Sequence, residues 1–243
     1  MTTTATPSSS SNKTAVAGIN TGPAPLLIAD GTLEALKWVA AALMVLDHLN
    51  KFLYLGKLPV LFEIGRVVMP IFGFVLAYNV ARPGAFARAA HLTIMKRLLV
   101  AGAVATPMFV ALVGWWPLNI LFMFVVMVAI TYCIEQGGPR EITLAVLLFV
   151  VGGAFVEFWW FALLFCLAAW IYCKKPTWFR LLLLVLATAN IAVINRNSWA
   201  LAALPILLAA PYVSVTLPRA RWWFYAFYPA HLAVLWVVKK AWF

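Results

Sequence analysis

The stretch AALMVLDHLNKFLYL, residues 41–55, places an aspartate and a histidine side by side in an otherwise apolar run. A charged side chain near the middle of a bilayer costs roughly 2.5–3.5 kcal/mol on insertion scales, so it persists where a bundle interior solvates it or where a function needs it. Histidine titrates near neutral pH and can therefore exchange a proton with a bound molecule. Asp47 and His48 are accordingly the first candidate site.

Other polar residues are predicted to lie at a similar depth. With about 1.5 Å of rise per residue and an apolar core about 30 Å thick, Asp47 and Arg66 both fall roughly 9 Å below the outer face of the membrane. His231 falls near the middle of the last apolar run, and Glu63 lies three residues before Arg66 on the same helical face. One polar pocket in the outer half of the membrane could collect them all, together with Asn119 and Glu157.

Each of these residues also has a purely structural explanation. Asp47 could pair with Lys51 at i+4, just as Glu63 could pair with the arginine three residues later. His231 could be neutral and donate to a carbonyl that the helix-breaking Pro229 leaves free. Three separate helices with ionisable groups at one depth are harder to explain in this way, because each unpaired group costs several kcal/mol in lipid.

The composition predicts an all-α, polytopic integral membrane protein. Of the 243 residues, 65% are apolar and 10% are charged, and the mean hydropathy is +0.98, which leaves too little polar surface for a soluble domain. The net charge of +11 does not indicate nucleic acid, because Lys and Arg concentrate in the cytoplasmic loops of membrane proteins. Cys133, Cys166 and Cys173 lack metal-ligand spacing, and no metal is expected.

Nine apolar segments, separated by charges, glycine or proline, predict a bundle of about nine transmembrane helices. The segments cover about residues 33–54, 60–80, 91–113, 117–134, 141–156, 157–173, 178–195, 198–216 and 222–242. Only VGGAFVEFWW separates the fifth from the sixth, so these two could form a tight hairpin, one re-entrant element or a single long helix. Eight spans instead of nine would move the C-terminus to the other side.

Residues 1–30 are rich in Thr, Ser, Ala, Pro and Gly and predict a flexible tail ahead of a helical domain over residues 31–243. The tail lacks the basic start and apolar core of a cleavable signal peptide. With nine spans, 12 Lys and Arg fall on one side and 6 on the other. The excess of positive charge on the inside then places the N-terminus in the cytoplasm and the C-terminus in the periplasm.

Three blocks of the sequence resemble the TraX family: LKWVAAALMVLDHLNKF, EIGRVVMPIFGFVLAYNV and FYAFYPAHLAVLWVVK, which together span residues 36 to about 240. The resemblance implies an acetyltransferase of the bacterial inner membrane that moves an acetyl group from acetyl-CoA to the N-terminal amine of a conjugative pilin. Met69 and Gly73 stand where the family usually has other small or apolar residues, which bears on the shape of the pocket.

Acetyl transfer from a thioester needs a base to take the acceptor's proton and a cation or donor to stabilise the oxyanion. His48 is the candidate base, Asp47 would orient it or charge the pocket, and Arg66 would contact the oxyanion or the substrate carbonyl. His231 either supports the base or is itself the base. The candidates for substrate binding are Glu63, Asn119, Glu157 and Tyr228.

Acetyl-CoA is cytoplasmic, whereas the polar pocket is predicted near the outer face. The pantetheine arm would therefore thread between helices, and the phosphates would stay at the inner mouth. The candidate phosphate ligands are Arg82, Arg88, Lys96 and Arg97. Three alternatives remain: a glycan hydroxyl as the acceptor, a proton-coupled transporter that uses the same Asp, His and Arg residues, and a membrane scaffold without chemistry. The sequence has no evident inverted repeat, which a transporter would favour.

Overall fold

The computed structural model describes residues 26–82, 87–220 and 222–242, and this part of the chain is helical without a β-strand. Residues 1–25 of the predicted tail lie outside it. The helices are α1 Asp30–Phe52, α2 Pro59–Gly65, α3 Val68–Ala81, α4 Ala87–Leu112, α5 Ile120–Gln136, α6 Pro139–Leu147, α7 Gly153–Phe155, α8 Trp159–Lys174, α9 Trp178–Asn190, α10 Ala192–Asn195, α11 Ala203–Ala209 and α12 Trp223–Trp242. A π-helix, Leu148–Gly152, joins α6 to α7, and 3₁₀ turns at Trp199–Ala202 and Ala210–Tyr212 flank α11.

Every predicted apolar segment contains helix, but not all of these helices have the length and apolarity of a membrane span. In the described residues three stretches do: Pro59–Ala81, Ala89–Leu112 and Trp178–Asn195. Shorter apolar helices cover Ile120–Gln136, Trp159–Lys174 and Trp199–Tyr212. These helices indicate a membrane protein, and the number of crossings stays a prediction.

The structure divides the second predicted segment and keeps the fifth and sixth apart. The second divides into α2 and α3 at a tight turn, where the N–H of Arg66 donates to the Glu63 carbonyl at 3.1 Å. The fifth and sixth are separate helices, because the chain turns between α7 and α8 and Phe158 adopts a positive φ of 61° there. A single long helix over this region is therefore wrong.

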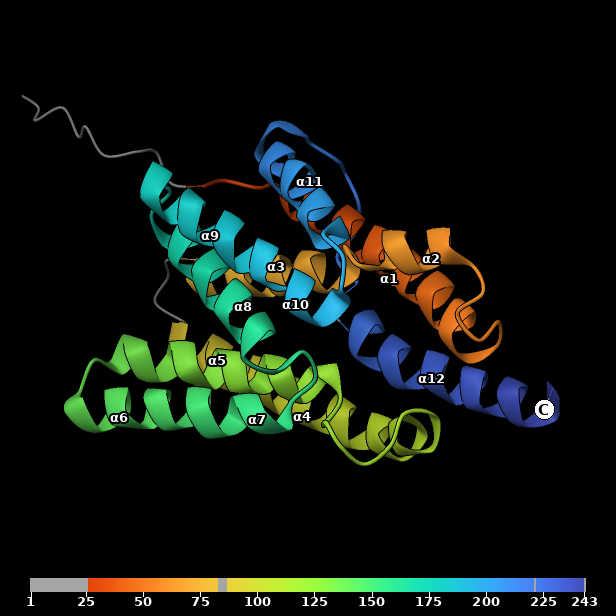
Figure 1. Cartoon of the computed structure of the whole chain (residues 1–243). Helices are drawn as coiled ribbons and strands as arrows, with labels where there is room; N and C mark the ends of the chain where they lie inside the picture. The colour runs from red at the N-terminus through yellow and green to blue at the C-terminus, as the bar shows by residue number, and fades with distance from the viewer. Residues whose placement is uncertain (1–25, 83–86, 221, 243) are drawn as a thin grey trace, which may run out of the picture.

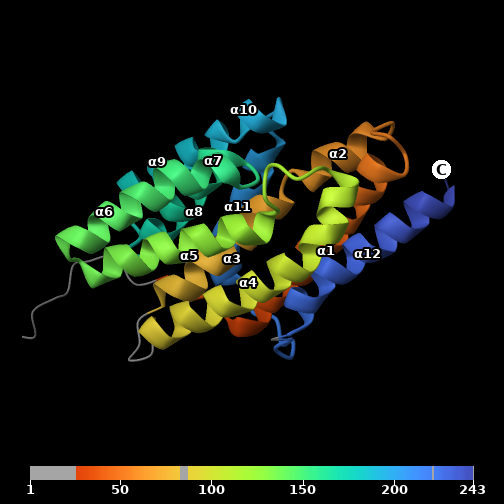
Figure 2. The ribbon, with the colours of Figure 1, turned by 90° about the horizontal axis from the view of Figure 1, so that it is seen from below.

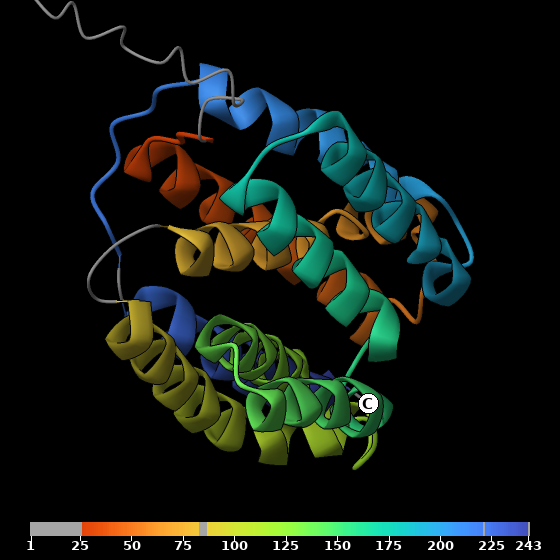
Figure 3. The same cartoon turned by 90° about the vertical axis from the view of Figure 1, so that its left-hand side faces the viewer.

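The helices form two layers, which Figure 1 and Figure 3 show one above the other. In the upper layer α3 packs between α1 and α8, and α8 also packs against α9. In the lower layer α4 packs between α5 and α12, and α6 packs against α5. Fewer contacts join the layers than hold each one together, so a space between them can remain open.

Helices α1 and α12 run side by side in the same direction (Figure 2). Near their N-terminal ends the rings of Trp38 and Trp223 are 5.6 Å apart. Near their C-terminal ends Lys239 lies over the ring of Phe52. The start of α1 and the end of α12 therefore lie at opposite ends of the bundle, as an odd number of crossings requires.

Two extended segments cover the start of α1. The backbone N–H of Ile28 donates to Tyr78 Oη at 2.8 Å, and Ile28 is buried, so packing begins a few residues before the predicted boundary at residue 31. Residues 213–220 cross the same end of the helix, where Thr32 Oγ1 donates to the Val213 carbonyl at 2.6 Å. A Cβ at Gly31 would overlap the Val215 carbonyl oxygen, so the crossing requires glycine.

Candidate functional site

A cavity of 630 Å³ lies between the two layers. Its wall has a cationic end, formed by Lys37, Arg82, Arg97 and Arg219, and a histidine end, formed by His48 and its polar neighbours. The middle is apolar and includes Met44, Phe72, Leu76, Phe124, Phe224 and Phe227. Lys37 and His48 are 11 positions apart on α1, which corresponds to about 16 Å of helix axis.

A chain of two hydrogen bonds fixes the protonation of the histidines. His231 Nδ1 lies 3.1 Å from the Phe227 carbonyl, and His231 Nε2 lies 2.8 Å from His48 Nδ1. A carbonyl only accepts, so in the neutral pair the proton of His231 sits on Nδ1 and its Nε2 accepts. His48 must then donate from Nδ1, which leaves the lone pair of His48 Nε2 available.

His48 belongs to the cavity wall, whereas His231 stands behind it. The two imidazole rings are nearly parallel, with centroids 5.1 Å apart, and they meet edge to edge through the hydrogen bond between their nitrogens. The ring of His231 also lies nearly parallel to that of Phe227. His231 does donate to a carbonyl, as its structural explanation predicts. However, the carbonyl that accepts is that of Phe227. Pro229, which has no N–H, leaves a different carbonyl free, that of Tyr225 four residues earlier.

Asp47 and Arg66 form an ion pair between α1 and the α2–α3 turn. Arg66 Nη2 donates to Asp47 Oδ1 at 2.7 Å, and the two side chains are 15% and 13% exposed, respectively. Arg66 Nε donates to the Phe62 carbonyl at 3.0 Å, and Nη1 donates to Asn195 Oδ1 at 3.4 Å. This cross-helix pair takes the place of the two local pairs considered from the sequence, Asp47 with Lys51 and Glu63 with Arg66.

Gly65 makes the close approach of α2 to α1 possible. A Cβ at Gly65 would lie 2.6 Å from Asp47 Cβ and 2.7 Å from Asp47 Oδ1. Any larger residue therefore displaces the carboxylate that Arg66 binds.

Replacing Gly65 with alanine is expected to lower the free energy of unfolding by about 1–3 kcal/mol, the usual cost of overpacking. Gly102→Ala is a matched control, because its added Cβ would lie 3.3 Å or more from its neighbours. Thermal melting of both variants in detergent measures the difference. Equal melting temperatures for the Gly65 variant and the unmodified protein would contradict this close packing.

Glu157 and Tyr228 meet in the cavity wall at the N-terminus of α5. The N–H of Glu157 donates to the Leu118 carbonyl at 2.9 Å, which holds the α7–α8 turn against the residues before α5. Glu157 interacts with the backbone N–H of Ile120 and with Tyr228. The unpaired N–H groups of a helix N-terminus favour such a carboxylate.

Two predicted substrate ligands are not wall residues in the part of the chain that the structure describes. Asn119 is buried as the N-cap of α5: its side chain donates to the Gly102 carbonyl and accepts from the Leu121 N–H. Its role is therefore to hold α4 and α5 together. Glu63 lies on α2 outside the wall. By contrast, Lys51 and Asn195 line the histidine end, although the sequence analysis assigned neither to the site.

The cationic end differs in part from the prediction. Arg82 and Arg97 line it, Lys96 is exposed and is not a wall residue among those described, and the side chain of Arg88 lies outside the described residues. Lys37 and Arg219 join the two arginines. Lys37 lies on helix α1 and Arg219 lies in the extended segment, so neither belongs to the basic loop from which the prediction was made.

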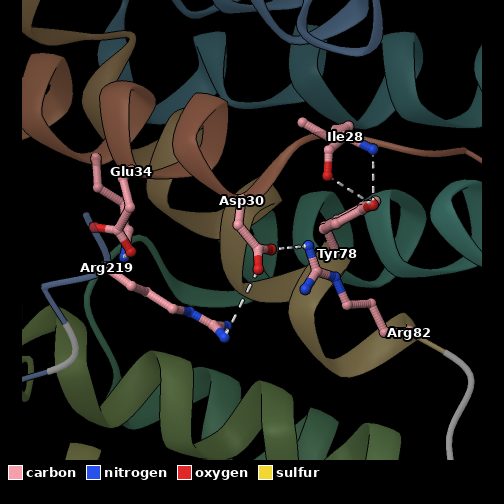
Figure 4. Close-up of polar contacts among 7 residues, drawn as sticks. Ile28, Asp30, Glu34, Tyr78, Arg82 and Arg219 are labelled. Carbon is pink, nitrogen blue, oxygen red and sulfur yellow. Dashed lines mark hydrogen bonds and ion pairs between the residues drawn. The ribbon is translucent and has the colours of Figure 1, made fainter. Parts of the chain in front are cut away.

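Asp30 connects the cations at this end (Figure 4). Its carboxylate accepts from Arg82 Nη2 at 2.5 Å and lies 3.9 Å from Arg219 Nη1. The hydrogen bond from Arg82 lowers the pKa of Asp30 below its usual value. Four cations thus share the mouth with Asp30 and Glu34 in the described residues, so the end carries a net positive charge.

The TraX protein family model matches residues 32–239. A Protein TraX from Escherichia coli is 32% identical over 228 residues, covering 88% of this chain and 89% of the relative. A second Protein TraX, from Escherichia coli strain K12, is 29% identical over 242 residues, covering 93% and 95%. No solved structure matches. The family model thus covers both ends of the cavity, from α1 to α12, and the chain belongs to the TraX family.

Proposed function

We propose that this protein is an acetyltransferase of the bacterial inner membrane that accepts acetyl-CoA from the cytoplasm and acetylates an amine at the opposite face. The observation that carries the proposal is the 630 Å³ cavity, which joins a cationic mouth, formed by Lys37, Arg82, Arg97 and Arg219, to the free nitrogen of His48. In this proposal the chain crosses the membrane nine times, with the start of α4 on the cytoplasmic side.

The successive parts of the cavity match the successive parts of acetyl-CoA, from the phosphates to the thioester. Arginine guanidinium groups bind phosphate through paired N–H donors, and Arg82 and Arg97 lie at the mouth. The pantetheine arm has the backbone length of roughly four residues, so it extends about 14 Å. Lys37 and His48 are separated by about 16 Å along α1. Phosphates held near Lys37 would therefore bring the thioester close to His48.

The histidine end suits acyl transfer by general base catalysis. The acceptor nitrogen attacks the thioester carbonyl, and His48 Nε2 takes the proton that the nitrogen loses. The tetrahedral intermediate then releases the CoA sulfur, which receives that proton from His48. Arg66 has N–H groups beyond the three that bind Asp47, Phe62 and Asn195, and these could stabilise the oxyanion.

Glu157 favours an amine over a hydroxyl as the acceptor. Asp47 is already paired with Arg66, but Glu157 stands in the same wall, and an N-terminal ammonium would pair with the Glu157 carboxylate before it loses its proton. The N-terminus of a conjugative pilin, the acceptor that the TraX resemblance implies, has this chemistry. A neutral glycan hydroxyl would gain no such ion pair.

Transfer by the purified protein tests the proposal. The protein in detergent is incubated with acetyl-labelled acetyl-CoA and a peptide with a free N-terminus, and CoA release and labelled peptide are measured. The same peptide with a blocked N-terminus and an oligosaccharide are the acceptor controls. Label is expected on the free peptide alone. Label on the oligosaccharide alone would move the acceptor to a glycan, and no CoA release with any acceptor would reject acetyl transfer.

A further inference from the structure

Glu34 is a buried carboxylate in the cavity wall that the catalytic proposal does not use. The residue is 2% exposed, and its Oε1 accepts from Lys37 Nζ at 2.6 Å. Its Oε2 is buried and has no hydrogen-bond partner within residues 26–82, 87–220 and 222–242. A buried acceptor without a partner is costly, and more so when it is charged. Glu34 Oε2 is therefore an acceptor that a hydrogen-bond donor on a bound molecule would satisfy.

The position of Glu34 limits which part of a bound molecule can supply that donor. Glu34 lies one turn beyond Asp30 on α1, about 6 Å closer to His48. Asp30 is the residue that binds Arg82 and Arg219, so Glu34 stands just inside the cationic mouth. Figure 4 shows Glu34 and Asp30 on the same helix, with the Arg219 side chain running from below Glu34 to below Asp30. A molecule that enters past Arg82 and Arg219 therefore meets Glu34 together with the Lys37 ammonium that it binds, before the apolar middle.

We infer that Glu34 binds the donor substrate by accepting a hydrogen bond from an O–H or N–H group of the pantetheine arm. The inference rests on the proposed function. A carboxylate repels phosphate and cannot bind a carbonyl, so only a donor group satisfies it. The first donor beyond the phosphates of CoA is the pantetheine hydroxyl, and the first amide N–H follows it.

The side chain can make this contact and keep its bond to Lys37. The terminal torsion of glutamate is broad, so either oxygen can turn towards the cavity at little cost. Each carboxylate oxygen also accepts more than one hydrogen bond. Lys37, held by Glu34 and lying 4.5 Å from the centre of the Phe224 ring, then remains beside the phosphates. Glu34 and Lys37 would thus bind two adjacent parts of the donor substrate, the pantetheine arm and the phosphates.

Binding of three ligands of decreasing length distinguishes the Glu34 contact from the phosphate contacts. The first is CoA. Pantetheine lacks the nucleotide and the phosphates, and N-acetylcysteamine also lacks the hydroxyl. Calorimetry measures CoA, and displacement of CoA measures the two fragments. Glu34→Gln is expected to weaken CoA and pantetheine by a similar factor of about 10–100, and to change N-acetylcysteamine by less than about twofold. Arg82→Gln is the matched variant, expected to weaken CoA alone.

Melting of each variant without ligand controls for folding. Where Glu34→Gln does not fold, Glu34→Asp, which keeps the charge but withdraws it by one methylene, is expected to give the same ligand pattern. Failure of the unmodified protein to bind CoA would reject the proposed function itself. Weaker binding of CoA but unchanged binding of pantetheine would mean that Glu34 acts only through Lys37, and it would overturn the inference. An equal loss for all three ligands would show a purely structural role and would overturn it too.

Discussion

Replacing His48 with alanine is expected to reduce acetyl transfer by a factor of about 10²–10⁴, the usual contribution of a general base. Binding of CoA should persist, because in the proposed function the phosphates bind at the cationic end, about 16 Å away along α1. Transfer rate and CoA affinity are measured on the same preparation. Full activity of the variant would end the assignment of His48 as the base.

His231→Ala is the matched variant for this prediction. It removes the acceptor of the His48 Nδ1 proton but leaves His48 Nε2 in the cavity wall. The rate should therefore fall by less than it does for His48→Ala, because only the orientation and the tautomer of the base are affected. A larger loss for His231→Ala than for His48→Ala would identify His231 as the base.

Neutralising one member of the Asp47–Arg66 pair is expected to lower the free energy of unfolding by about 3 kcal/mol, because the remaining charge is left buried without its partner. Both Asp47→Asn and Arg66→Gln should also lose transfer, since Arg66 lies in the wall beside His48. Thermal melting in detergent, with a transfer assay on the same samples, measures the two effects.

The double variant of Asp47→Asn with Arg66→Gln distinguishes a coupled pair from two independent residues. Removing both charges leaves neither uncompensated, so the double variant should be more stable than either single variant. Its transfer activity should stay low, because the cation is still missing. Additive losses of stability in the double variant would show that the 2.7 Å contact contributes nothing to folding.

The level of Asp47 relative to Arg66 was predictable from the sequence because the rise of a helix per residue is fixed. That rule placed Asp47 level with Arg66, and the structure joins them at 2.7 Å. The choice of partner was not predictable in the same way. Pairing across helices depends on how closely the backbones approach, and here it depends on the missing side chain of Gly65.

The other differences between the predicted and the observed site also have physical causes. Asn119 stands directly before an apolar run, where asparagine is a frequent N-cap, and that signal could have identified its role. Arg219 and Asn195 reach the cavity from segments far from α1 in the chain, and only the packing of the layers brings them there. Lys37 was visible as a charge near the start of an apolar helix, but its place in the cavity wall depends on the neighbouring helices.

Sided transfer in lipid vesicles tests most directly whether one cavity carries the acetyl group from the cationic end to His48. The protein is reconstituted with a free-amine peptide trapped inside, and labelled acetyl-CoA is added outside. Reaction of a Lys57→Cys variant with an impermeant thiol reagent reports the orientation, since Cys133, Cys166 and Cys173 are buried. Labelled peptide should accumulate inside only where the cationic end faces outward, and His48→Ala vesicles should accumulate it more slowly by a factor of about 10²–10⁴. Transfer that requires acetyl-CoA and peptide on the same side would contradict a cavity that joins the two faces.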